Sequence, residues 1–127
     1  MKIVIFAGSE SDSWFTEKLE KFAAAEKIAT EIFFGSAHKM PAKILENVQK
    51  FANEKVVFVT VAGRSNALSG VIAANTKKPV LACPPFRDKT DFLVNINSTL
   101  QMPSKTPVLT ILDPQNAILA AKKILEL

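Results

Sequence analysis

The chain opens with KIVIFAGSESD (residues 2–12), an unbroken apolar run that ends in a glycine and a cluster of small polar residues. Residues 56–62, VVFVTVA, repeat this pattern and lead into the polar turn of residues 63–66. Continuous apolar runs rich in β-branched residues predict strands buried on both faces, which is typical of a parallel sheet. Further candidate strands are residues 30–35, 80–83 and 108–112.

Three apolar stripes with helical spacing lie between or after these strands. The first has Ser11 or Asp12 placed to cap it, and the second begins at Pro41. The third follows Asp113-Pro114, because aspartate caps a helix well and proline suits its first position. The residues of the stripes are Phe15, Leu19, Phe22 and Glu26; Ile44, Leu45, Val48, Phe51 and Ala52; and Ala117, Ile118, Ala121, Ile124 and Leu125.

The segment from Leu68 to Asn75 is apolar nearly all round, which is typical of a helix buried on more than one side. In so small a domain we interpret it as a subunit contact; the alternative is a tightly covered helix inside a monomer. Residues 84–105 form a less regular stretch. The order of elements predicts a single domain over residues 1–127, an α/β fold built as a flavodoxin-like three-layer α/β/α sandwich around a five-stranded parallel sheet.

The composition of the chain argues against membrane and nucleic-acid partners. No apolar run is long enough for a membrane span, no secretory signal is visible, and a single cysteine suits the cytoplasm, so we expect a cytoplasmic protein without membrane contact. The net charge is +4, but the lysines are dispersed and no aromatic residues alternate with them. We therefore expect no nucleic-acid partner, and a small anionic substrate fits the charge equally well.

Three polar clusters follow three candidate strands directly: residues 8–12, 36–39 and 63–66. Successive strands of a parallel sheet end at the same edge, where ligands bind, so the clusters are predicted to converge on one pocket. The second cluster contains His38, the only histidine of the chain.

Each cluster has a functional and a structural interpretation. In the first, the serines and helix amides can hold a phosphate and Asp12 can accept hydrogen bonds from a ribose diol, although a simple capped helix start fits as well. In the second, His38 can exchange a proton near neutral pH and Lys39 offers a point charge for a phosphate; the alternative is an ordinary surface loop. In the third, Ser65 can cap a helix or bind a ligand, and Arg64 can bind an anion or form an ion pair.

Cys83 ends the fourth candidate strand. A catalytic thiol needs a partner base, and pairing with His38 is conceivable, but a small buried residue is the better interpretation. One histidine and one cysteine give no metal-ligand spacing, so no metal site is expected.

Taken together, the motifs resemble the purine-biosynthesis family that carboxylates aminoimidazole ribonucleotide. The resemblance covers almost the whole chain and is carried by residues 8–12, Ser36-Ala37-His38, residues 73–76 with Pro79-Val80, Gln101-Met102-Pro103 and the alanine-rich residues 116–121.

The family has two classes, and this chain is similar to the second. Class I mutases carry a second histidine in a Gly-Ala-Ala-His-Leu-Pro-Gly segment, where this chain reads AGRSNALSG (residues 62–70). The pairs His38-Lys39 and Cys83-Pro84, the latter followed by a second proline, also resemble class II, the phosphoribosylaminoimidazole carboxylases that use carbon dioxide directly.

The resemblance implies an enzyme, a carboxy-lyase, that needs no cofactor, ATP, biotin or metal. It also implies a homo-octamer with sites at subunit boundaries, and His38 as the general acid/base. The residues it implies for ribonucleotide binding are Ser9, Asp12, Ser36, Lys39, Gly63 and Ser65. Family members usually continue beyond the alanine-rich helix with a tail that packs on neighbouring subunits, whereas the sequence given ends at Leu127.

Three other functions are the competing hypotheses. A class I mutase would move a carboxylate from the exocyclic nitrogen of the substrate to its ring with the same histidine. A flavodoxin-type electron carrier usually has aromatic residues beside the flavin, and Trp14, the only tryptophan, lies inside the first predicted helix. A receiver domain needs an aspartate at the end of the third strand, where this chain has Ala62-Gly63-Arg64.

Overall fold

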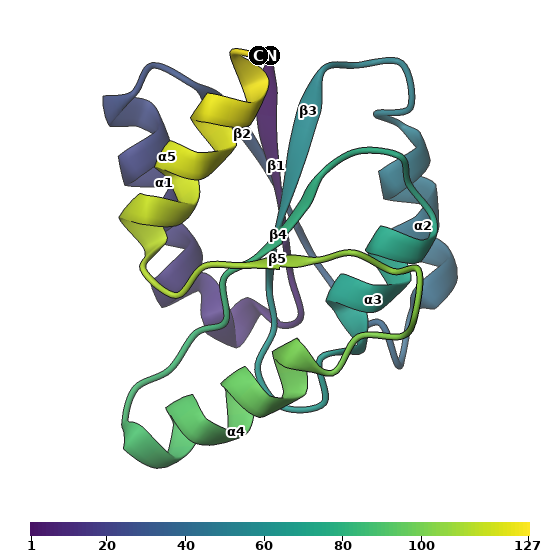
Figure 1. Cartoon of the computed structure of the whole chain (residues 1–127), viewed down its shortest axis with the longest axis vertical. Helices are drawn as coiled ribbons and strands as arrows, with labels where there is room; N and C mark the ends of the chain where they lie inside the picture. Colours follow the sequence, from purple (N-terminus) through teal and green to yellow (C-terminus); the bar gives the residue numbers. More distant parts are fainter.

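Five parallel strands form one sheet in the order β2-β1-β3-β4-β5, in a computed structural model that describes all of residues 1–127 (Figure 1). The strands are β1 (Lys2–Ala7), β2 (Ala29–Phe34), β3 (Val56–Val61), β4 (Val80–Ala82) and β5 (Leu109–Thr110). The helices are the short 3₁₀ turn η1 (Glu10–Asp12), α1 (Ser13–Ala25), α2 (Pro41–Gln49), α3 (Ala67–Ala74), α4 (Lys89–Leu100) and α5 (Pro114–Leu125). The predicted flavodoxin-like α/β fold is confirmed.

The central strands of the sheet are almost completely buried. Every residue of β3 is buried, as are all residues of β1 except Lys2. In register, Ile5 of β1 lies beside Ile32 of β2 and Val59 of β3. Burying such side chains contributes about 1.5–3 kcal/mol each, which explains why the apolar runs become the central strands.

Helices cover both faces of the sheet, as Figure 1 shows. On one face α1 and α5 bury Leu19 and Ile118, and on the other α2 and α3 bury Val48 and Ile72. The α5 start agrees with its sequence signal, because the Asp113 side chain accepts a hydrogen bond from the amide of Asn116 at 2.9 Å. The three-layer arrangement is therefore the predicted one.

Helix starts and ends differ from the predictions in two places. Asp12 occupies the position before α1, but neither it nor Ser11 caps this helix with its side chain; Ser9 caps η1 instead, by accepting from the Ser11 amide. Helix α2 ends at Gln49, so Phe51 reaches the core from a turn and Ala52 is exposed.

Two features of the C-terminal half were also predicted incorrectly. The stretch assigned as irregular contains α4, twelve residues capped by Asp88. Strand β5 spans only two of the five residues predicted; it lies at the sheet edge beside β4, and the Ile111 amide just after it still donates to Ala82 at 3.0 Å. Helix α4 lies beyond the carboxyl ends of the strands (Figure 1).

Helix α3 is only partly covered by its own chain. Leu68 and Ile72 are buried, Val71 and Ala73 are half-buried, and Ala74 is exposed. The contact of this helix with another subunit stays a prediction. No helix of the chain combines the length and the apolar character needed to cross a membrane.

Candidate functional site

The turns after β1, β2 and β3 meet at the carboxyl edge of the sheet. Two backbone hydrogen bonds each join the first residue of a turn to the last residue of a neighbouring strand: the Gly8 amide donates to Val61 of β3 at 2.9 Å, and the Gly35 amide donates to Ala7 of β1 at 2.9 Å. Between the turns is a cavity of about 190 Å³. Its lining residues are Gly8, Ser9, Asp12, Ser36, Ala37, His38, Ala62, Gly63, Arg64, Ser65, Ala67 and Leu68.

The structure thus brings together all but one of the predicted site residues. Lys39 is the exception: it does not line the cavity, its side chain is exposed, and its backbone amide donates to Ser36 Oγ at 3.3 Å. The sequence could place Lys39 beside His38 but not orient its flexible side chain.

His38 reaches across the cavity to the turn after β3. Its Nε2 lies 3.2 Å from the Ser65 carbonyl oxygen and 3.4 Å from Ser65 Oγ. A carbonyl oxygen can only accept, so this contact requires a proton on Nε2. In the neutral ring the lone pair is then on Nδ1, and this atom can take up a proton.

Two serines in the cavity wall accept hydrogen bonds from backbone amides of their own turns. Ser36 Oγ accepts from the His38 amide at 3.2 Å, and Ser9 Oγ accepts from the Ser11 amide at 3.2 Å. Because both hydroxyl oxygens act as acceptors in these bonds, their own protons can be donated to a ligand. A phosphate or hydroxyl group in the cavity would therefore meet two donors from different loops.

Asp12 faces the cavity without a capping role. Burial raises the pKa of its carboxyl above the ordinary value, nearby Arg87 opposes this rise, and Asp91 adds to it. A carboxylate in this position can accept hydrogen bonds from a diol.

The third turn has strained geometry. Ser65 has φ 51°, in the left-handed region, which costs a non-glycine residue about 1–2 kcal/mol. Its neighbour Arg64 forms an ion pair with Asp91 of α4, with 3.5 Å between Nη2 and Oδ1, and it also lines the cavity, so binding of an anion by Arg64 stays a prediction. At Gly63, an added Cβ would lie 3.4 Å from the Asn95 side-chain amide, so this glycine packs directly against α4.

Helix α4 contributes residues that the sequence analysis missed. Asn95 is 3% exposed, donates to the Pro85 carbonyl, and has no partner for Oδ1. With Arg87 and Asp91 it lines a second hollow of about 310 Å³ that adjoins the first through Asp12 and Gly63. The Asp88-x-x-Asp91 spacing was the available signal, because the Asp88 side chain accepts from the Asp91 amide at 2.8 Å and starts the helix.

Cys83 does not line the cavity with His38. The thiol is buried, and its Sγ lies 3.7 Å from the Leu112 carbonyl oxygen. Burial, with a smaller contribution from Asp113, raises the pKa of Cys83 to about 12. The interpretation as a small buried residue is confirmed.

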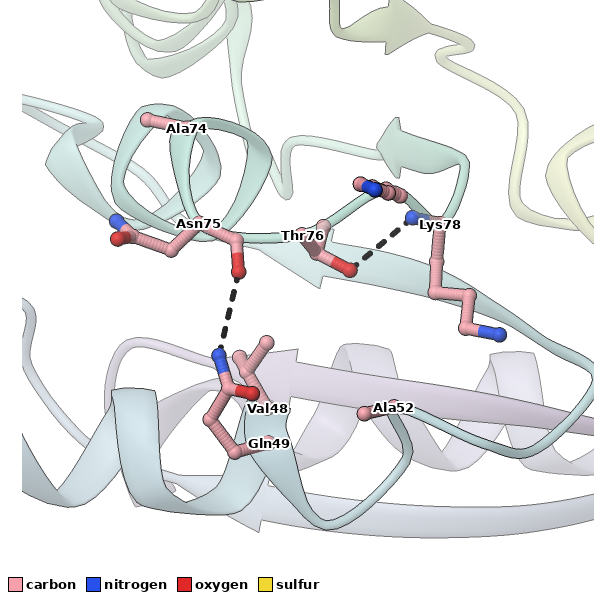
Figure 2. Close-up of a pocket in the computed structure, with 8 residues that line it drawn as sticks. Val48, Gln49, Ala52, Ala74, Asn75, Thr76 and Lys78 are labelled. Atoms are coloured by element: carbon pink, nitrogen blue, oxygen red, sulfur yellow. Dashed lines mark hydrogen bonds between the residues drawn. The ribbon is translucent and has the colours of Figure 1, made fainter.

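A larger cavity, of about 630 Å³, lies at the opposite edge of the sheet, where α2 and α3 end (Figure 2). Figure 2 shows its walls joined by a bond from Gln49 to the Asn75 carbonyl and closed by the turn from Thr76 to Lys78. Its ionisable lining groups are the amines of Lys77 and Lys78 alone. The smaller cavity holds the imidazole, the carboxylate and the hydroxyls, so it is the candidate site.

Comparison with known proteins points in the same direction. A family model described as AIR carboxylase matches residues 2–127. The phosphoribosylaminoimidazole carboxylase of Archaeoglobus fulgidus is 46% identical over 127 residues, which are 100% of this chain and 70% of that protein. The probable multifunctional protein ADE2 of Caenorhabditis elegans is 40% identical, and the match covers 97% of this chain but 29% of that protein.

Solved structures agree with the sequence matches. The crystal structure of Treponema denticola PurE superposes with a TM-score of 0.89 at 34% identity, covering 98% of this chain and 79% of that one. So close a match over nearly the whole length includes the sheet and the three turns that form the cavity.

Proposed function

Since the chain belongs to the AIR carboxylase family, we propose that it joins carbon dioxide to aminoimidazole ribonucleotide to give the carboxylated ribonucleotide, without ATP, biotin or metal. The observation that carries this proposal is the meeting of the only histidine with the three polar turns in one cavity. One proton-transfer group is what the reaction needs.

The chemistry follows from the electron-rich aminoimidazole ring. Its ring carbon forms a bond to the carbon of carbon dioxide, and an electron pair moves onto oxygen to give a carboxylate. The same ring carbon then carries both a proton and the carboxylate. His38 accepts this proton on its lone pair, the electron pair of the C–H bond returns to the ring, and aromaticity is restored.

The cavity walls supply binding groups for the nucleotide. Ser9 and Ser36 donate to phosphate or ribose oxygens, Asp12 accepts from the ribose diol, and Lys39 attracts the phosphate from the rim. The small residues Ala37 and Gly63 leave room for carbon dioxide beside the ring. Holding the two reactants in the correct orientation lowers the activation barrier by roughly several kcal/mol.

Direct carboxylation is favoured over the mutase reaction by the turn after β3. Residues 62–70 contain no histidine, whereas class I mutases carry a second histidine in the corresponding segment. We also propose that copies of the chain assemble into a homo-oligomer, expected to be an octamer, through the partly covered helix α3. Light scattering of the purified chain tests the assembly.

The test of the reaction offers two substrates to the purified chain in the absence of ATP. One sample receives aminoimidazole ribonucleotide with dissolved carbon dioxide, the other N-carboxyaminoimidazole ribonucleotide, and ultraviolet absorbance follows the product. We expect turnover of the uncarboxylated ribonucleotide at a rate that rises with carbon dioxide. Turnover of the N-carboxylated compound alone would identify a mutase, and turnover of neither would refute the proposal.

A further inference from the structure

The peptide group that joins Ser65 to Asn66 connects α4 to His38. Its carbonyl oxygen accepts from His38 Nε2 at 3.2 Å, and its N–H donates to Ser98 Oγ at 2.5 Å. The bond is trans, like every peptide bond of this chain. The C=O and N–H of a trans peptide are coplanar and point in opposite directions, so fixing one aims the other.

A buried polar network holds this peptide group in place. Asn66 is 8% exposed; its Oδ1 accepts from the Ser69 amide at 3.1 Å and its Nδ2 donates to Thr99 at 3.1 Å. Ser69 in turn lies 2.6 Å from the hydroxyl of Thr60 in β3. The peptide group is therefore anchored to β3, α3 and α4. A buried N–H that loses its acceptor lowers the stability of the fold by about 1–3 kcal/mol, so these bonds hold the peptide group in one orientation.

We propose that Ser98 is a positioning residue for His38. Its hydroxyl accepts the Asn66 N–H, which aims the Ser65 carbonyl at the imidazole, keeps the resting proton on Nε2 and leaves the lone pair on Nδ1. Ser98 lies outside the cavity lining and acts only through this peptide group. Its effect on the reaction rate rests on the proposed function, whereas its effect on the imidazole does not.

The experiment uses the fact that the chain has one histidine. Nitrogen-15 NMR of the neutral ring measures the ratio of the Nε2–H to the Nδ1–H tautomer in the full-length protein. In Ser98→Ala this ratio should fall about two- to tenfold, the equivalent of one hydrogen bond of ordinary strength. Ser98→Thr keeps the hydroxyl and should restore the ratio, and Thr90→Ala, an exposed hydroxyl on the same helix, should leave it unchanged.

Kinetics give the second readout. With turnover established, Ser98→Ala should lower kcat about tenfold or more while KM stays within about threefold, because the base is misplaced and the nucleotide contacts remain. If Ser98→Ala does not fold, Ser98→Cys, whose sulfur is a weaker acceptor, replaces it and should show smaller changes in the same direction.

The outcomes separate this proposal from the proposed function. A changed tautomer ratio in a chain without carboxylase turnover would support the role of Ser98 and refute the function. An unchanged ratio in Ser98→Ala would refute the role of Ser98 even if kcat fell, because the loss would then arise elsewhere. A ratio that falls equally in Ser98→Ala and Ser98→Thr would also refute it.

Discussion

Alkylation of the single thiol provides a quantitative test of the core. Burial raises the pKa of Cys83 from 9.0 to about 12. Only the thiolate reacts with iodoacetamide, and at neutral pH its fraction falls tenfold for each step of the pKa, so a rise of three steps lowers it about 1,000-fold. Complete burial of the side chain slows the reaction further.

The assay compares two labelling rates at the same pH, one for the folded chain and one for the chain in urea, each followed by mass spectrometry. We expect the folded chain to react at least about 30-fold more slowly, because the lower thiolate fraction outweighs the greater nucleophilicity of a thiolate with a raised pKa, and burial adds to the effect. Cys83→Ala, which cannot be labelled, is the control and should keep its carboxylase turnover. A folded rate within about tenfold of the unfolded rate would refute the burial of this thiol and reopen a nucleophilic role beside His38.

Three further changes test separate parts of the molecule. Lys39→Ala should weaken nucleotide binding while the rate at saturation holds, as isothermal titration and kinetics would show; a lower rate with intact affinity would contradict a phosphate role. Asp113→Ala should destabilise the fold by about 1 kcal/mol in urea titrations, because the α5 amide of Asn116 loses its cap, with Gln115→Ala as the control. Burial raises the pKa of Asp12 in the folded chain. Protonation of this carboxyl therefore stabilises the fold, and this contribution to the free energy of unfolding is fully present below the pKa of the unfolded state and is lost as pH rises through the pKa of the folded state. The wild-type chain should therefore gain stability relative to Asp12→Asn as pH falls from 7 toward 4; a constant difference would contradict the raised pKa.

The central fold was predictable because its signals are local and apolar. Residues such as Val57 and Val59 lie in a continuous run rich in β-branched residues, which is typical of a strand buried on both faces. The convergence of the three turns follows from the parallel order of the strands, which places Ser9, His38 and Ser65 at one edge.

Helix α4 was missed because it buries polar residues and exposes apolar ones, the reverse of the usual helical pattern. The residues it buries are the polar Asn95 and Thr99, whereas Leu93 and Leu100 are exposed. Asparagine and β-branched residues are also weak helix formers, so neither periodicity nor propensity indicated a helix. Helix α4 is stabilised by tertiary contacts, because the hydroxyls of Ser98 and Thr99 accept hydrogen bonds from the backbone and side-chain amides of Asn66.

Asp12 holds the predicted N-cap position of α1, but its side chain makes no capping hydrogen bond. Ser9, Ser11 and Asp12 are all good capping residues, and sequence spacing does not distinguish among them. In the folded chain Ser9 takes the capping role for η1, which leaves the Asp12 carboxylate at the cavity. The position of Asp12 at the site therefore depends on a short turn that the sequence did not reveal.

Replacing His38 by asparagine tests the acid/base assignment most directly. His38→Asn keeps a polar side chain at the cavity but cannot take up the ring proton. With aminoimidazole ribonucleotide and carbon dioxide, this variant should lose turnover while binding the ribonucleotide within about tenfold of the wild-type affinity. Turnover that persists at the wild-type rate would remove His38 from the reaction and contradict the account.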